Sequence, residues 1–100
     1  MKVQDLFDEM VKGDSYATKA IPGGIMIRDQ YGTAVTYSDA AKTLTFKFGG
    51  AEDEDAVLFG TSISAEAPIT MYMSGDELTI QVPNVDSEKA ADIVKKILEA

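Results

Sequence analysis

The stretch ITMYMSGDELTIQV, residues 69–82, decides the fold. Apolar side chains occupy alternate positions on both sides of Ser74–Glu77, and polar side chains such as Tyr72 and Thr79 lie between them. A period of two is typical of half-buried strands. Gly75 can adopt a positive φ and Asp76 can hydrogen-bond to its own backbone, so the centre favours a turn. The stretch therefore predicts an antiparallel hairpin with one apolar and one polar face.

The segments before this hairpin show the same alternation. We predict strands over residues 25–28, 33–37 and 43–48, and a weaker pattern over residues 14–21 fits an edge strand. Short turns, such as Ile21-Pro22-Gly23-Gly24, predict that consecutive strands are antiparallel neighbours. Four apolar or small side chains then alternate in what we expect to be one more strand, with Gly60 as a bulge: Val57, Phe59, Thr61 and Ile63.

Both ends of the chain have the spacing of an amphipathic helix. Apolar residues recur at i, i+3, i+4, i+7 and i+8 in two sets: Val3, Leu6, Phe7, Met10 and Val11, and later Ala90, Ile93, Val94, Ile97 and Leu98. Gly13 is expected to end the first helix in a left-handed conformation. Asn84, Asp86 and Ser87 are alternative N-caps of the last helix.

Together these segments predict a single α+β domain over residues 1–100. Its parts are an N-terminal helix, a mainly antiparallel meander sheet with five or six strands, and a C-terminal helix. Two helices about 10 Å wide can cover roughly 20 Å of a sheet, so we expect both on the same face. The alternative is a bent sheet or small barrel capped by the C-terminal helix.

The other face of the sheet should be rich in threonine. The polar positions of the strands supply it, and they are Thr43, Thr45, Lys47, Thr70, Tyr72, Thr79 and Gln81. Such a face could bind a partner or a second copy, but threonine is also simply the polar residue that best suits strands. Both interpretations stay open.

The charge is strongly negative, with a formal net charge of −8 and no Lys or Arg between Lys47 and Lys89. Six acidic residues in that interval are our candidate partner-binding residues: Glu52, Asp53, Glu54, Asp55, Asp76 and Glu77. A field of this sign opposes the approach of phosphate backbones and favours a basic protein surface. The alternative is that the charge only keeps a small domain soluble. Residues 49–55 are expected to form an exposed, mobile break between strands.

No residue pattern predicts catalysis or a cofactor. The chain has no histidine and no cysteine, so the usual general base and thiolate chemistry is missing. The contiguous carboxylates Glu52–Asp55 lack the alternating spacing of a calcium loop. The glycine pairs fit no phosphate-binding motif, so we expect no catalytic residue, no cofactor and no metal ligand.

The first hypothesis for function is a non-catalytic protein-binding module. It would act as an inhibitor, possibly a phage or mobile-element type that imitates nucleic acid, or as a chaperone or adaptor. The second is a structural or regulatory homo-oligomer that joins edge strands or the threonine-rich face, and a carboxylate-based enzyme is a third. We expect no direct nucleic-acid binding and, with no apolar run near roughly 20 residues and no signal peptide, a soluble cytoplasmic protein without a membrane partner.

Overall fold

The computed structural model describes residues 1–13 and 17–98. Its elements in chain order are α1 (Val3–Lys12), β1 (Thr18–Ile21), β2 (Gly24–Ile27), β3 (Ala34–Ser38), β4 (Thr43–Phe48), α2 (Asp53–Ser64), β5 (Thr70–Ser74), β6 (Glu77–Val82) and α3 (Ser87–Leu98). The strands form one antiparallel sheet in the order β1-β2-β3-β4-β6-β5. The predicted α+β fold is confirmed, and the sheet is open rather than a closed barrel.

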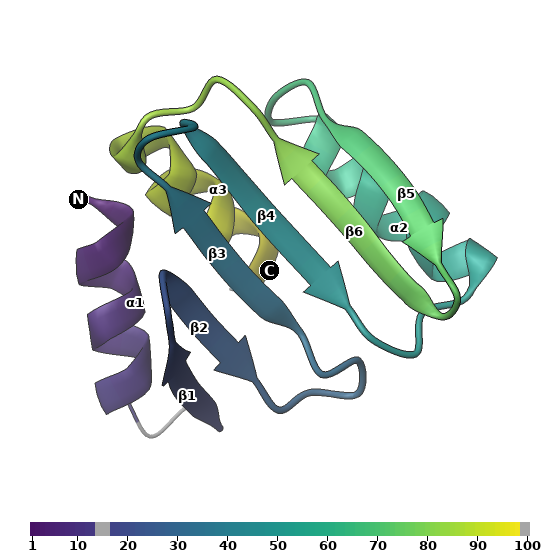
Figure 1. Ribbon diagram of the computed structural model, residues 1–100, viewed down its shortest axis with the longest axis horizontal. Helices are drawn as coiled ribbons and strands as arrows, with labels where there is room; N and C mark the ends of the chain where they lie inside the picture. Colours follow the sequence, from purple (N-terminus) through teal and green to yellow (C-terminus); the bar gives the residue numbers. More distant parts are fainter. Residues whose placement is uncertain (14–16, 99–100) are drawn as a thin grey trace.

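The helices lie on one side of the sheet. In Figure 1, α2 and α3 lie behind the strands, and α1 runs beside β1 and β2. Helix α1 also packs against α3, and the main-chain amide of Val3 donates a 2.9 Å hydrogen bond to the Ser87 hydroxyl. The face of the sheet toward the viewer carries no helix.

The core lies between the sheet and the helices. It uses the apolar face that the alternation predicts, and fully buried examples include Phe46, Ile80 and Val82. The helical stripes supply the other side through Phe7 and Ile93. Burying each such side chain contributes about 1.5–3 kcal/mol, so these contacts fix the helices on this face.

The hairpin predicted over residues 69–82 is present as β5 and β6. The two turn residues are Gly75 and Asp76, and Gly75 has a φ of 63°. Its predicted apolar face is well buried only on β6, because β6 lies between β4 and β5 while β5 is the last strand of the sheet. Met71 and Met73, expected in the core, are 42% and 36% exposed.

The strand expected over Val57–Ile63 is wrong, because these residues belong to helix α2. Ala56, Gly60 and Ile63 are the buried positions of α2 and follow helical spacing, while Val57 is 68% exposed. The predicted break over residues 49–55 is wrong in its second half for the same reason. Negatively charged side chains in the first turn of a helix interact favourably with the helix dipole, so this acidic segment suits the start of α2.

The end of the first helix differs from the prediction. Gly13 has a φ of −76°, so the first helix does not end in a left-handed residue. Instead, the Gly13 amide donates to the carbonyls of Glu9 and Met10. The predicted edge strand is present over Thr18–Ile21, whereas residues 14–16 of that prediction lie outside the described residues. Asp86 is the N-cap that α3 uses, since its Oδ1 accepts from the Lys89 amide at 2.8 Å.

Candidate functional site

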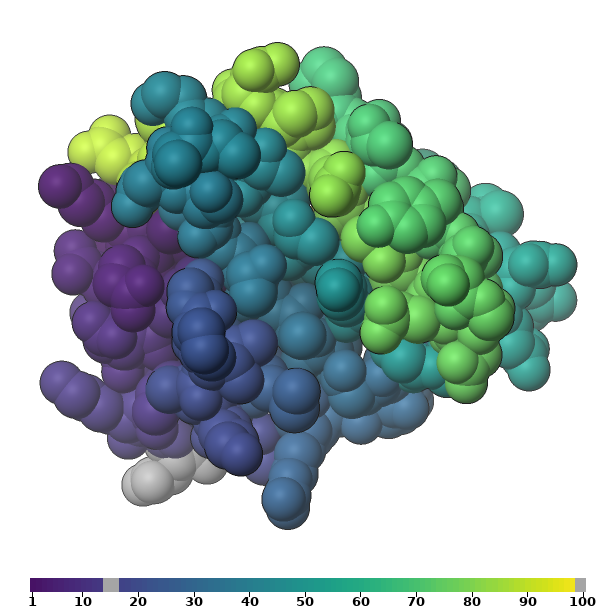
Figure 2. Space-filling view, viewed as in Figure 1, coloured from purple at the N-terminus to yellow at the C-terminus, as the bar shows by residue number. Residues whose placement is uncertain are grey.

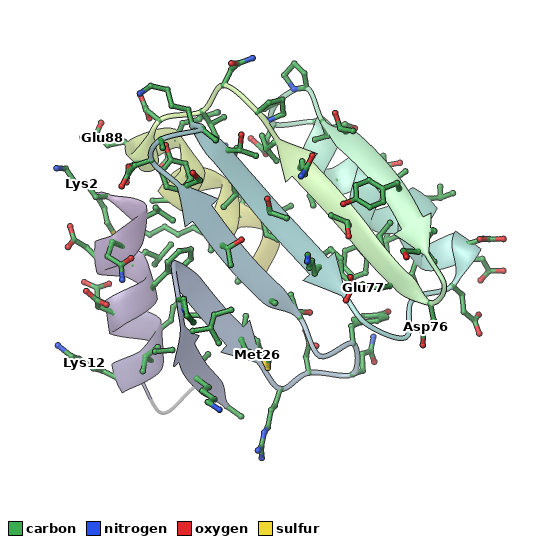
Figure 3. The ribbon with its side chains drawn as sticks, viewed as in Figure 1. Lys2, Lys12, Met26, Asp76, Glu77 and Glu88 are labelled. Carbon is green, nitrogen blue, oxygen red and sulfur yellow. The ribbon has the colours of Figure 1, made fainter. Side chains whose placement is uncertain are left out.

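The six candidate partner-binding residues come from two segments that the fold brings together. The main-chain amide of Ala51, just before α2, donates a 2.9 Å hydrogen bond to the carbonyl of Asp76 in the β5–β6 turn. We call the resulting cluster the acidic end; its members are Glu52, Asp53, Glu54, Asp55, Asp76 and Glu77. Figure 3 labels Asp76 at the tip of the hairpin and Glu77 nearby, over the uncovered face of the sheet toward the end of β4. The acidic end thus joins two segments about twenty residues apart in the chain. Its α2 members lie on the helix side of the sheet, whereas Glu77 shares the uncovered face with Thr79.

Two of these residues stabilise the start of α2. The Asp55 carboxylate accepts a 2.9 Å hydrogen bond from the Glu52 amide through one oxygen and a 3.0 Å bond from the Tyr31 hydroxyl through the other. The bond to Asp55 raises the pKa of the Tyr31 phenol, and partial burial adds to the shift. Tyr31 also meets Phe59 of α2 edge-to-face, with ring centroids 5.2 Å apart. These contacts fix the direction in which the helix presents its acidic first turn.

The other four carboxylates are exposed and unneutralised. Asp53, Glu54, Asp76 and Glu77 are all exposed. Within the described ranges 1–13 and 17–98, the single ion pair is Lys96 to Glu66, with an N–O distance of 2.9 Å, so no member of the acidic end has one. Exposed carboxylates without cationic partners contribute to a negative potential above the surface.

Beside the acidic end lies an uncovered strand edge. Strand β5 ends at the Gly75-Asp76 turn, and its residues are all exposed. Helix α2 packs beneath β5, because a Cβ added at Gly60 would be 2.9 Å from the Met71 sulfur. Val57 of α2 adds another exposed apolar side chain. We call this set the β5 edge; its members are β5 itself and Val57.

The β5 edge is a feature that the sequence reasoning missed. The sequence predicted that Met71 and Met73 share a buried face, but their exposure depends on which strand is last in the sheet. The helical spacing of Ala56, Gly60 and Ile63 was the signal that could have revealed α2.

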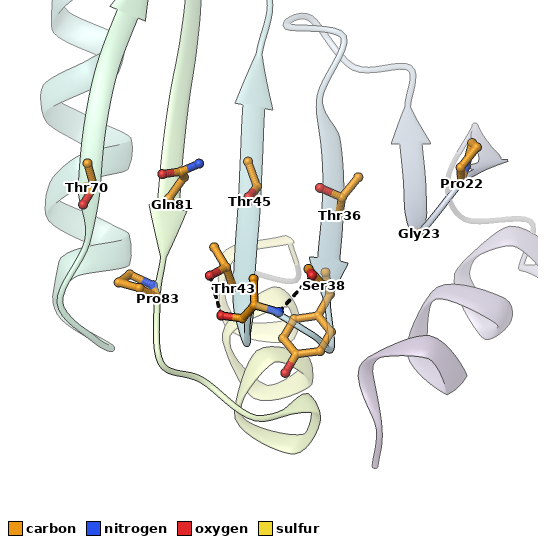
Figure 4. Close-up of a pocket in the computed structure, with 11 residues that line it drawn as sticks. Pro22, Gly23, Thr36, Ser38, Thr43, Thr45, Thr70, Gln81 and Pro83 are labelled. Atoms are coloured by element: carbon orange, nitrogen blue, oxygen red, sulfur yellow. Dashed lines mark hydrogen bonds between the residues drawn. The ribbon is translucent and has the colours of Figure 1, made fainter.

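The uncovered sheet face carries the predicted threonine-rich set of side chains, but Thr79, expected to be exposed, is only 2% exposed. Register pairs place Thr45 opposite Gln81, Lys47 opposite Thr79 and Tyr72 opposite Thr79. A shallow depression of about 490 Å³ lies over this face (Figure 4) and is lined by Pro22, Gly23, Thr36, Tyr37, Ser38, Ala41, Thr43, Thr45, Thr70, Gln81 and Pro83. None of these lining residues is an aspartate, glutamate, lysine or arginine.

Two further side chains have raised pKa values. The pKa of Tyr37 is raised by burial, and that of Lys96 is raised by its hydrogen bond to Glu66. Both shifts favour the protonated state that each side chain already has at neutral pH. Among the residues the structure describes, no three acidic side chains are grouped so that they could hold a metal ion.

No protein family, curated protein or solved structure matches the chain. In the described part of the chain, no helix has the length and apolar character needed to cross a membrane.

Proposed function

We propose that this protein is a non-catalytic protein-binding module whose acidic end engages a basic surface on a partner. The observation that supports this proposal is that a main-chain hydrogen bond joins two acidic segments whose six carboxylates have no ion-pair partner among the described residues. Such an arrangement works against stability, because each carboxylate adds to the repulsion on the others. A basic partner relieves that repulsion when it binds.

Two roles are compatible with this binding mode. As an inhibitor, the module would occupy a nucleic-acid-binding cleft by presenting carboxylates where phosphates normally lie. As a chaperone or adaptor, it would hold a basic segment of its client. In both roles the field of the acidic end would speed association at low salt and lose its effect within a Debye length of about 8 Å at physiological salt.

The test is affinity capture from the native host at low and at high salt, followed by measured binding to the captured protein. The charge-neutral variant changes the four exposed members of the acidic end and is D53N/E54Q/D76N/E77Q. The matched control removes the same charge from exposed positions on α1 and α3 and is D5N/E9Q/E88Q/D92N.

We expect salt to weaken the wild-type complex steeply and the first variant to lose about tenfold or more in affinity, against about twofold for the control. Equal losses in both variants would show that only net charge matters. A complex insensitive to salt and to both variants would refute the proposal.

A second candidate function is a structural or regulatory homo-oligomer. The observation that favours it is the uncovered sheet face, where Met26 and Tyr72 are 43% and 49% exposed. Light scattering across micromolar concentrations decides this candidate, because a mass that stays at one chain excludes it.

A further inference from the structure

The outer edge of β5 has free backbone hydrogen-bonding groups. β5 is the last strand of the sheet, and β6 is its only neighbour in the strand order. Ser74 and Glu77 flank the two-residue turn and are register partners. Hydrogen-bonded pairs alternate along an antiparallel ladder from such a turn, so the N–H and C=O groups of Met71 and Met73 face away from β6.

This edge lacks the features that normally prevent strand addition. Between Thr70 and Ser74 there is neither a charged residue nor a proline. The opposite edge strand, β1, is better protected. It carries Lys19, packs against α1, and has its Thr18 hydroxyl bonded to the Met10 carbonyl at 2.9 Å. Because β5 is the less protected of the two edge strands, an extended chain would add to the sheet beside β5.

Helix α2 lies beneath that open edge. Gly60 contacts Met71 from below, and Val57 remains 68% exposed. In Figure 2 the teal atoms of α2 extend beyond the green atoms of β5 at the right of the molecule. A strand added to β5 would therefore lie over α2, and every second side chain would meet Val57, Met71 and Met73.

The acidic end determines which charge a strand added to β5 should carry. The Ser74 end of β5 leads directly into Asp76, and the Ala51–Asp76 hydrogen bond brings the first turn of α2 to the same place. Cationic side chains at that end of an added strand would face Asp53, Glu54 and Asp76. Apolar side chains would suit the rest of the edge.

We propose that an extended segment of a partner protein adds to β5 as a seventh, antiparallel strand. Its N-terminal residues are basic and lie at the acidic end, and its alternate side chains over α2 are apolar. This inference rests on the proposed function and names the chemistry and the conformation of the partner segment.

A second copy of this chain fits the edge poorly. Neighbouring strands lie about 4.8 Å apart. In an antiparallel pairing of two β5 strands, each copy would bring its own α2 beneath its own β5 on the same face, so the two helices would be separated by a similar distance. Packed helices need 8–10 Å between their axes. The occupant is therefore an extended segment without a helix beneath it.

The test uses a synthetic peptide, acetyl-Lys-Lys-Val-Thr-Val-Thr-Val-amide, and amide hydrogen exchange of the full chain measured by NMR. The control peptide replaces both lysines with glutamate. We expect the Lys peptide to slow exchange of the Met71 and Met73 amides by about tenfold at saturation, and the Glu peptide to have no such effect.

Two matched variants locate the interaction. Met73→Pro removes an outward N–H of β5 without breaking its ladder to β6, and Ala20→Pro does the same on the β1 edge, where Ile21 and Gly24 flank the turn. We expect Met73→Pro to weaken peptide binding about tenfold and Ala20→Pro to change it less than about twofold. If Met73→Pro does not fold, the exchange data on the wild-type chain decide alone.

The outcomes separate this inference from the proposed function. Lys-peptide binding that depends on the acidic end but leaves Met71 and Met73 exchange unchanged overturns the inference and leaves the proposed function standing. If the Glu peptide also slows exchange of the Met71 and Met73 amides, the inference that the added segment is basic is overturned. Absence of Lys-peptide binding, or a dimer that Met73→Pro abolishes, also overturns the inference, while the salt-dependent capture experiment still judges the proposed function.

Discussion

The Ala51 amide and the Asp76 carbonyl are joined by a 2.9 Å main-chain hydrogen bond. This bond connects the loop before α2 to the turn of the β5–β6 hairpin and brings the two acidic segments next to each other. It is made by backbone atoms, so side-chain substitutions at the acidic end should change its charge without removing the bond that assembles it.

Asp76→Asn should stabilise the protein slightly at low salt. The substitution removes one of several like charges from the acidic end, and its side chain has no hydrogen bond among the described residues. The gain should be about 0.3 kcal/mol, typical of relieved like-charge repulsion at a surface. Urea unfolding at low and high salt measures it, and the difference from wild type should shrink as salt is added.

The control for this prediction is Asp92→Asn on α3. Asp92 lies near Lys96 and helps raise the pKa of that side chain, so its charge is favourable. Its removal should leave stability unchanged or lower it slightly. Equal stabilisation by both substitutions would mean that only the net charge of −8 is being relieved.

Gly24→Ala should be strongly destabilising. A Cβ at this position would be 1.9 Å from the carbonyl oxygen of Val35 on the neighbouring strand, and backbone cannot move aside as a side chain can. We expect a loss of about 3 kcal/mol or more in the free energy of unfolding. Gly13→Ala is the control, since its nearest contact would be 3.5 Å away, and it should behave almost as wild type.

Gly60→Ala should stabilise the protein. Alanine is favoured over glycine inside a helix by about 1 kcal/mol, and the atom nearest to the new methyl group is the sulfur of the flexible, partly exposed Met71. Allowing for the displacement of Met71, we expect a net gain of about 0.5 kcal/mol in thermal or urea unfolding. A loss larger than about 1 kcal/mol would show that Met71 cannot move aside and would contradict this prediction.

Tyr37→Phe should lower stability and change its dependence on alkaline pH. The Tyr37 hydroxyl donates a 2.7 Å hydrogen bond to the Val85 carbonyl, and its loss should cost about 1 kcal/mol at neutral pH. Burial raises the pKa of Tyr37 in the folded protein, so the folded state holds this proton more tightly than the unfolded state. The resulting stability is complete below the unfolded value of about 10 and is lost as pH rises through the folded value.

Wild type should therefore lose stability more steeply above pH ~10 than Tyr37→Phe does. Urea unfolding at a series of alkaline pH values measures the two slopes. Tyr72→Phe removes a hydroxyl from an exposed ring and serves as the control, with stability close to wild type at neutral pH. Parallel slopes for wild type and Tyr37→Phe would contradict the assignment.

Much of the fold is predictable because the side-chain period is unambiguous in several segments. Residues 43–48 alternate cleanly and form β4 at the predicted bounds. The terminal apolar stripes form α1 and α3. Residues 57–63 are different, since Val57, Phe59, Thr61 and Ile63 alternate while Ala56, Gly60 and Ile63 also fit a helix. The Asp55 contacts with Glu52 and Tyr31 favour the helix, and the Tyr31 contact is long-range, so a local pattern cannot reveal it.

The candidate site, like the fold, is only partly predictable from local patterns in the sequence. Sequence identifies the six carboxylates, but their convergence depends on α2 carrying the chain across to β5 and on β6 returning between β4 and β5. That strand order also leaves Met71 and Met73 exposed at the edge. Proximity of distant segments and membership of an edge strand are properties of topology, which periodicity does not encode.

The packing of the first helix against the last has a consequence for synthesis on the ribosome. Val3 bonds to Ser87, and the apolar side of α1 shares the core with Ile93 and Val94 of α3. A nascent chain emerges N-terminus first, so α1 can pack against β1 and β2 early but must wait for nearly the whole domain to be translated before α3 can pack against it. The complete core can therefore form only after residues 87–98 have left the exit tunnel.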